Sequence, residues 1–208
     1  MPQLTSSKLN VLFRSLLGVS RKFLKIIAKH SDRLNAIIED LLSLSRLEED
    51  SEKRKLSFEE TSIKHALVSA IELSTVKAEE KHIAVELSCD KDIKAKINPA
   101  LIEQAALNLI DNAIKYSRNN SKIEVKAEKT KDEVLITVSD EGCGIEKEHL
   151  ERIFERFYVV DKGRSRKLGG TGLGLSIVKH IAQVHGGYVT IESKPGSGSK
   201  FSIHLPAE

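Results

Sequence analysis

Three polar side chains share one face of a mostly apolar segment near the middle of the chain. Asn108, Asn112 and Lys115 are spaced i, i+4 and i+7, which places them on one side of a helix. Two amides and an ammonium group are costly to bury without partners. An amide oxygen suits a hard cation such as Mg²⁺ and an ammonium group suits a phosphate, so the spacing indicates a magnesium–phosphate ligand. A solvated polar face is the alternative, and the apolar residues around the rest of this helix weaken it.

A first glycine-containing segment runs from Asp140 to Ile145 (DEGCGI) and follows an alternating stretch that predicts a strand. Asp140 could accept a hydrogen bond from an exocyclic amine, and Gly142 and Gly144 would leave room for a flat ring against the backbone. An ordinary turn can have the same pattern, so this segment is informative only in combination with others.

A second glycine cluster, GGTGLGL over residues 169–175, opens a helix predicted over 173–184. Backbone amides at a helix N-terminus bind anions well when glycine leaves them uncovered. The cluster is not a Walker loop, since no Gly-Lys-Ser/Thr follows. It is not a dinucleotide-binding fingerprint either, since a polar basic stretch precedes it instead of a strand. A glycine-rich hinge is the alternative, and a mobile lid over phosphates would use the glycines in both ways.

The scaffold that positions these segments combines helices and strands. Besides the helix over 173–184, the sequence predicts helices over 62–80, 99–116 and 146–154. Alternating apolar residues predict strands over 83–87, 123–127, 134–139, 188–192 and 200–205. Two pairs of strands are adjacent in the sequence, which favours an α+β two-layer sandwich over a doubly wound parallel sheet.

The first fifty residues predict a helical module. Between residues 23 and 48 there is no Gly or Pro, and apolar residues recur about every 3.5 residues, the spacing of a coiled coil or helical bundle. This seam consists of Phe23, Ile27, His30, Leu34, Ile37, Leu41 and Leu44. A shorter helix is predicted from Ser7 to Leu17, ended by Gly18 as a C-terminal cap. The two helices would form a hairpin, and two chains would complete a four-helix bundle; packing against the rest of the same chain is the alternative.

A run of charged residues from Glu48 to Lys55 interrupts the apolar periodicity and predicts a linker. A chain of 208 residues is long enough for a small module and a larger domain. We therefore expect a helical hairpin over residues 1–50, a linker over 51–60 and an α/β domain over 61–208.

The composition argues against several classes of protein. The 33 basic residues nearly balance the 30 acidic ones, so the net charge of +3 gives no reason to expect nucleic acid as a partner. Aromatic residues make up 4% of the chain, too few for a platform that stacks single-stranded bases. Two cysteines without a CxxC pattern predict neither a disulfide framework nor a cysteine zinc site. No membrane span or signal peptide is predicted, so we expect a cytoplasmic location, with a parent protein that could be membrane-anchored.

In this order and spacing, the polar helix face, the two glycine segments and the sequence FERFY over 154–158 resemble the catalytic domain of two-component sensor histidine kinases. The resemblance extends over residues 20–206 and implies a sandwich of the Bergerat ATP-binding type, with ATP and Mg²⁺ as ligands. The family's N box, first glycine box, F box, ATP lid and second glycine box would be residues 108–116, 140–145, 154–158, 159–169 and 170–174. The helix over 23–48 resembles the second helix of the dimerisation and phosphotransfer hairpin.

The resemblance also implies roles for individual residues. Asn112 would hold Mg²⁺, Lys115 would contact a phosphate, and Asp140 would bind the adenine amino group. The other residues implied in ATP binding are Asn108, Tyr116, Gly142, Gly144, Ile145, Gly170, Thr171, Gly172, Leu173 and Gly174. The residues implied in catalysis are Asn108, Lys115 and Arg166.

Asn108 separates this chain from similar proteins that hydrolyse ATP rapidly. Gyrase- and MutL-type ATPases place a glutamate four residues before the magnesium-binding asparagine, where it activates water. An amide cannot deprotonate water at neutral pH. The residue therefore favours transfer of a phosphoryl group to a nucleophile such as a neutral imidazole.

The sequence departs from the family at two places. The acceptor motif, a histidine followed by Glu or Asp and then a proline, is absent, because no histidine precedes His30. His30 lies on the apolar seam and is expected to be a packed histidine rather than an acceptor. Val159 stands where many relatives carry an arginine that faces the phosphates, which predicts weaker stabilisation of the transferring group. Arg166 and Lys167 in the lid are the candidates to compensate.

The function favoured by these residues is that of a sensor histidine kinase core, which transfers the γ-phosphoryl group of Mg-ATP to a histidine for relay to a response regulator. The expected partners are a response-regulator receiver domain and a second copy of the chain, bound through the N-terminal helices. The missing acceptor and Val159 favour an alternative, a non-catalytic ATP-gated binding module or an engineered dimeric scaffold. Asn108 disfavours a general ATPase.

Overall fold

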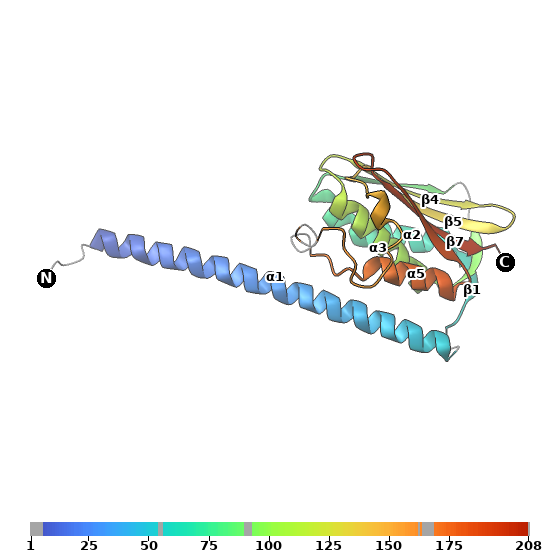
Figure 1. The fold of residues 1–208 in the computed structure, drawn as a ribbon, viewed down its shortest axis with the longest axis horizontal. Helices are drawn as coiled ribbons and strands as arrows, with labels where there is room; N and C mark the ends of the chain where they lie inside the picture. Colours follow the sequence, from blue (N-terminus) through green and yellow to red (C-terminus); the bar gives the residue numbers. More distant parts are fainter. Residues whose placement is uncertain (1–5, 54–55, 90–92, 162, 164–168, 208) are drawn as a thin grey trace.

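The computed structural model describes residues 6–53, 56–89, 93–161, 163 and 169–207, and of residues 6–19, 22 and 52 it describes the backbone alone. A long helix, α1 (Ser6–Glu52), precedes a domain of helices and strands (Figure 1). The first half of this domain contains β1 (Glu59–Ser62), α2 (Ile63–Glu79), β2 (Ala84–Cys89), β3 (Lys94–Ile97) and α3 (Pro99–Tyr116). The second half contains β4 (Lys122–Lys129), β5 (Glu133–Asp140), the 3₁₀ turn η1 (Lys147–His149), α5 (Gly174–Val184), β6 (Tyr188–Ser193) and β7 (Ser199–Pro206).

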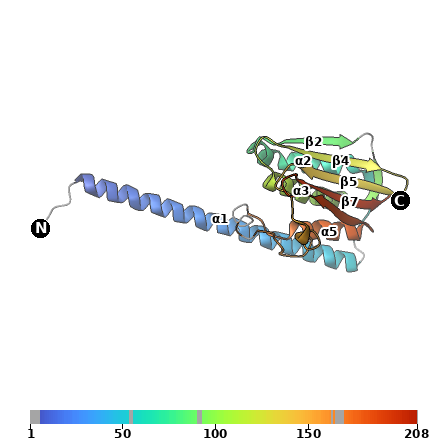
Figure 2. The same ribbon diagram turned by 45° about the horizontal axis from the view of Figure 1, so that its top comes forward.

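Five strands form one mixed sheet in the order β2-β4-β5-β7-β6. β2 and β4 are parallel, and the other neighbouring pairs are antiparallel. Helices α2, α3 and α5 cover one face of this sheet (Figures 1 and 2). Alternate residues of β5 point into the core between the sheet and the helices, and Val134, Ile136 and Val138 are at most 1% exposed. The predicted α+β two-layer sandwich is therefore confirmed.

Most predicted elements of this domain form close to the predicted bounds. One predicted helix is wrong, and two short strands were not predicted. The helix predicted over 146–154 is wrong: a short 3₁₀ turn, Lys147–His149, is followed by further turns held by bonds such as Glu155 N to Arg152 O. The short strands β1 and β3 were not predicted, and they pair antiparallel in a separate two-stranded sheet. β1 (EETS) has no apolar residue, and β3 (KAKI) alternates charged and apolar residues over only four positions, which is too short a pattern to mark a strand.

Helix α1 runs through Gly18 without a break, so the predicted hairpin over residues 1–50 does not form in this chain. One glycine within a helix costs only about 1 kcal/mol relative to alanine, and the residues on both sides outweigh it. The N-terminal part of α1 projects away from the domain, whereas its C-terminal turns lie along α5 (Figures 1 and 2). No helix among the described residues is long and apolar enough to cross a bilayer.

The predicted apolar seam is split between these two parts of α1. Leu44 and Leu47 are 2% and 4% exposed against the domain, so packing within the same chain is correct for these turns. Phe23, Ile27 and Leu34 are each about 60% exposed. A second chain that completes a bundle stays a prediction, and it would have to cover this exposed part.

The C-terminal end of α3 is held by a lysine from the loop after α2. Lys81 Nζ donates to the carbonyl oxygens of Ile114 and Lys115, at 2.6 and 3.0 Å. The last carbonyls of a helix have no partner within the helix, and a cation there also interacts favourably with the helix dipole. The other end begins at Pro99, and the Asn98 side chain caps it by accepting from Leu101 N at 3.2 Å.

Lys81→Met should therefore lower the free energy of unfolding by about 1–2 kcal/mol, because it removes hydrogen bonds from a charged donor to the last turn of α3. Urea denaturation followed by circular dichroism measures this. Lys200→Met is the matched control, since Lys200 Nζ makes only a 3.4 Å ion pair with the exposed Glu192 on the open face of the sheet. Equal stability of the two variants would show that Lys81 does not hold the helix end.

Candidate functional site

The polar face of α3 lies where the sequence places it, beside the start of α5. Asn108, Asn112 and Lys115 are all half-buried, whereas the opposite side of the helix is fully packed. The two helices meet in van der Waals contact, since a Cβ at Gly174 would lie 3.4 Å from Asn108 Oδ1. The amide of Asn108 therefore faces the first turn of α5.

The loop after β5 turns back over the end of α3. Asp140, the last residue of β5, accepts a 2.7 Å hydrogen bond from Gly142 N through Oδ1. A Cβ at Gly142 would lie 2.8 Å from the carbonyl oxygen of Tyr116, so only glycine lets the two backbones come this close. Ile145 N donates to Ser193 Oγ at 2.9 Å and ties the far end of the loop to β6.

Burial raises the pKa of the Asp140 carboxyl, while hydrogen bonds from the backbone of Gly142 and Ser199 act in the opposite direction. Gly144 has a φ of +67°, and a Cβ there would lie 2.1 Å from the carbonyl oxygen of Lys194. The loop is thus fixed by backbone contacts and presents a partly buried carboxylate next to glycine.

The second glycine cluster is joined to the FERFY segment by the backbone. Phe157 N donates to Gly172 O at 2.8 Å, and both residues have positive φ, +61° and +79°. Thr171 Oγ1 accepts from Leu173 N at 3.2 Å, just before α5 begins, and Leu173 is fully buried. The amides and the hydroxyl at the N-terminus of α5 are therefore held in one rigid turn.

Lys115 is a half-buried cation of this site, with charges of both signs around it. Burial lowers the pKa of Lys115; the charges of Asp111 and Asp40 act to raise this pKa, and the charge of Lys77 acts to lower it. Asp111 Oδ2 also accepts from Lys77 Nζ at 2.6 Å, while its Oδ1 is buried without a hydrogen-bond partner among the described residues. Asp111 is i+3 from Asn108 on the same face, a spacing that could have identified it, although the sequence analysis did not include it.

Helix α1 lies over the second glycine cluster, a contact that was not predicted from the sequence. Arg33 Nε donates to Gly170 O at 3.2 Å, and Gln104 Nε2 of α3 donates to Ser43 Oγ at 2.7 Å. A salt bridge joins Glu48 of α1 to Arg156 of the FERFY segment.

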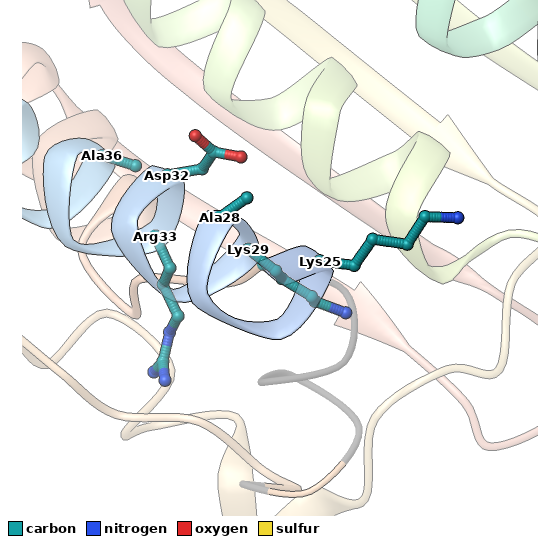
Figure 3. Close-up of a pocket in the computed structure, with 7 residues that line it drawn as sticks. Lys25, Ala28, Lys29, Asp32, Arg33 and Ala36 are labelled. Atoms are coloured by element: carbon teal, nitrogen blue, oxygen red, sulfur yellow. The ribbon is translucent and has the colours of Figure 1, made fainter. Parts of the chain in front are cut away.

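A cavity of about 380 Å³ lies between α1 and Gly169 (Figure 3). It is lined by Lys25, Ala28, Lys29, Asp32, Arg33, Ala36 and Gly169. In Figure 3 the side chains of Lys25 and Arg33 point in different directions, so these cations do not converge on one point.

The structure thus brings together the predicted residues of α3, of the loop over 140–145 and of the cluster over 170–174. Arg166 and Lys167 lie outside the described residues. His30 is exposed on the projecting part of α1, rather than packed as expected. No group of three or more His, Cys, Asp or Glu side chains that could hold a metal exists in the described part of the chain. The amide oxygens on α3 nevertheless fit Mg²⁺, which takes most of its ligands from water and phosphate when it binds with a nucleotide.

Comparison with known proteins agrees with this arrangement. Residues 97–208 match the family described as histidine kinase-, DNA gyrase B-, and HSP90-like ATPase. The sensor-like histidine kinase SenX3 of Mycolicibacterium smegmatis is 36% identical over 186 residues, which cover 89% of this chain and 48% of SenX3. The sensor histidine kinase WalK of Bacillus subtilis is 35% identical over 190 residues, which cover 90% of this chain and 31% of WalK. The chain therefore spans about half or less of the length of these relatives.

Among solved structures, full-length ShkA is similar with a TM-score of 0.69 and 26% identity, covering 99% of this chain and 40% of ShkA. The family match covers more than half of the chain and includes α3, both glycine segments and four of the five strands of the large sheet. The chain therefore belongs to the histidine kinase-, DNA gyrase B- and HSP90-like ATPase family, and it is a catalytic ATPase core of the sensor histidine kinase type, related to SenX3 and WalK.

Proposed function

We propose that this chain binds Mg-ATP at the site between α3, the loop over 140–145 and the cluster over 170–174, and transfers the γ-phosphoryl group to a histidine. The observation that carries the proposal is the meeting of these three segments at α3. Gly142 approaches the carbonyl of Tyr116, and Gly174 approaches the amide of Asn108. The similar protein ShkA was solved in complex with AMPPNP, which supports a nucleotide at this site.

Asp140 is proposed to select adenine. Its carboxylate already accepts from Gly142 N through Oδ1, and it can accept the exocyclic amino group of adenine as well, since a carboxylate has several acceptor positions. Gly142, Gly144 and Ile145 provide backbone against which the flat ring can lie.

The phosphates are proposed to lie between Lys115 and the first turn of α5. Thr171 Oγ1 and the amides of Gly172 and Leu173 are located at the helix N-terminus, where an anion is favoured. A phosphate would replace Thr171 as the acceptor for Leu173 N. Asn112 would hold Mg²⁺, which, when bound, neutralises charge on the phosphates.

Transfer to an imidazole is favoured by Asn108, which stands where related ATPases carry the glutamate that activates water. In the proposed step the lone pair of a neutral histidine attacks the γ-phosphorus, a P–N bond forms, and the bond to the bridging oxygen breaks, so that ADP leaves with the electron pair. The histidine then loses its ring proton to solvent. Asn108 cannot take a proton from water, which disfavours hydrolysis.

The partners follow from the same proposal. A second copy of the chain would cover the exposed apolar part of α1, where Phe23, Ile27 and Leu34 are solvent-accessible. A response-regulator receiver domain would take the phosphoryl group from the acceptor histidine.

Asn112→Ala should weaken binding of Mg-ATP about tenfold or more, because it removes the amide oxygen proposed to hold the cation. Isothermal titration calorimetry with and without Mg²⁺ measures the effect. Asn119→Ala removes the same side chain from an exposed loop and should bind like the unchanged protein. If Asn112→Ala retained full, Mg²⁺-dependent affinity, the proposed magnesium position would be wrong.

Asp140→Asn should separate stability from binding. Because burial raises the pKa of Asp140, the charged carboxyl is unfavourable in the folded state, so the variant should be more stable than the parent at pH 7. This gain should shrink as the pH falls through the raised pKa, where the parent carboxyl is also neutral. Urea denaturation at neutral and acidic pH measures it.

The same Asp140→Asn variant should bind ATP about tenfold or more weakly at pH 7, because the second acceptor for the adenine amino group is lost. Asp132→Asn, in an exposed turn, should change neither stability nor affinity. A loss of affinity accompanied by a loss of stability would indicate a folding defect instead of a role in adenine recognition.

Incubation with ATP labelled at the γ-phosphate tests the transfer. The chain alone should gain no stoichiometric acid-labile phosphate, since the usual acceptor is absent, whereas an added helical hairpin with an acceptor histidine should be labelled. Intact mass spectrometry and acid treatment identify the product, and Asn112→Ala is the inactive control. A chain that binds ATP but labels no added acceptor would be a binding module instead of a kinase.

A further inference from the structure

Phe157 adopts a backbone conformation that its own side chain does little to stabilise. Its φ is +61°, in the left-handed region that is strained for a residue with a bulky side chain. The Phe157 ring is 55% exposed, so packing of the ring offsets little of this strain. Strained residues persist only where the surrounding structure fixes them, and they concentrate at functional sites. Contacts made by neighbouring residues must therefore hold Phe157 in place.

Tyr158, the next residue, is anchored through both its hydroxyl and its ring. Its hydroxyl oxygen lies 2.7 Å from His149 Nδ1, and the two groups share a hydrogen bond. His149 Nε2 faces the Glu148 carboxylate at 3.6 Å, which favours the ring proton on Nε2 and leaves Nδ1 to accept from the hydroxyl. The Arg152 guanidinium lies 4.4 Å from the centre of the Tyr158 ring, and two hydrogen bonds to Glu155 hold it there. This double anchor also restrains the peptide that joins Tyr158 to the preceding residue.

The backbone of Phe157 in turn sets the direction of an amide just before α5. Phe157 N donates to Gly172 O at 2.8 Å. The peptide between Gly172 and Leu173 is planar and trans, so its N–H points opposite to its carbonyl. With this carbonyl held by Phe157, the Leu173 N–H points away from the FERFY segment and donates to Thr171 Oγ1 at 3.2 Å. The same N–H is one of the amides proposed above to bind a phosphate.

We propose that Tyr158 and His149 are positioning residues for the phosphates of the nucleotide. Their hydrogen bond holds Phe157 in its strained conformation, and Phe157 then aims the Leu173 amide at a phosphate oxygen. The inference rests on the proposed function, because it takes the amides before α5 as phosphate ligands. A donor that is already held in its binding direction loses little conformational freedom when the anion binds, so the clasp raises the affinity for phosphates.

The effect of this clasp should be confined to the phosphate end of the site. At the other end, Asp140 is held by the backbone of Gly142, and Gly142 lies against the carbonyl of Tyr116. None of these contacts involves Tyr158 or His149. Adenosine, which has the base and the sugar but no phosphate, should therefore bind equally well with and without the clasp.

Tyr158→Phe should bind Mg-AMPPNP about threefold more weakly or worse, because it removes the hydroxyl and leaves the ring beside Arg152. Calorimetry on the full chain measures this with AMPPNP, an ATP analogue whose γ-phosphate is not transferred. The affinity for adenosine, measured by NMR titration because this method suits weak ligands, should not change. Tyr188→Phe is the matched control, since it removes the same hydroxyl from a ring that is 56% exposed and stacked on His204, and it should bind both ligands like the parent.

A double-mutant cycle tests whether the hydrogen bond itself is responsible. His149→Phe keeps an aromatic ring and removes the acceptor nitrogen, so it should weaken binding of Mg-AMPPNP by about the same factor as Tyr158→Phe. The double variant should bind like either single variant, because both changes remove one and the same interaction. Circular dichroism confirms that all three variants fold.

The outcomes separate this inference from the proposed function. If Tyr158→Phe binds Mg-AMPPNP like the parent, or loses equal affinity for adenosine, Tyr158 does not position the phosphate ligands, although the nucleotide site stands. Losses that add up in the double variant, or an equal loss in Tyr188→Phe, would also overturn the inference. If the parent itself binds neither ligand, the proposed function fails and this inference fails with it.

Discussion

The burial of one side of α3 against the sheet is the constraint on which the site depends. Seven residues of this helix, Ile102, Ala105, Ala106, Leu109, Ile110, Ala113 and Ile114, are packed in the core and fix its rotation about its axis. A helix fixed in this way must present its remaining face, with Asn108, Asn112 and Lys115, to whatever lies opposite. The geometry of the site is therefore set by apolar packing that makes no contact with a ligand.

The other two segments of the site, the loop over 140–145 and the cluster over 170–174, are positioned by close contacts of their backbones with neighbouring elements. Gly142 lies against the end of α3, Gly174 lies against its polar face, and the turn at Gly172 is bonded to Phe157. A side chain at Gly142 would push the two backbones apart, and one at Gly172, which has a φ of +79°, would strain the backbone. Main-chain donors and a few side chains are therefore the groups that these segments bring to α3, an arrangement that suits an anionic ligand with a flat ring.

Much of this could be predicted from the sequence because local patterns determine it. The helical spacing of Asn108, Asn112 and Lys115 predicted the polar face of α3, and the alternation of apolar and polar residues predicted the strands of the large sheet. The prediction that a helix ends at Gly18 was wrong, because the preference of glycine for a helix C-terminus is outweighed by the helix-forming residues on both sides. The hydrogen bond from Arg33 Nε to Gly170 O could not be predicted, since it depends on how α1 docks, and no local pattern specifies contacts between residues so far apart in the chain. Arg166 lies outside the described residues, so its role stays a prediction.

The continuity of α1 has a mechanical consequence. Its 47 residues form a rod about 70 Å long, with one end free of the domain and the other seated on the glycine cluster. A twist applied at the free end turns every residue along the rod, and a twist of about one residue's angular step, roughly 100°, would carry Arg33 away from Gly170. Gly18 is the only glycine in the rod, and no proline interrupts it, so this is where torsional stiffness is lowest. The rod therefore links its free end to the second glycine cluster through one continuous helix, with Gly18 between them.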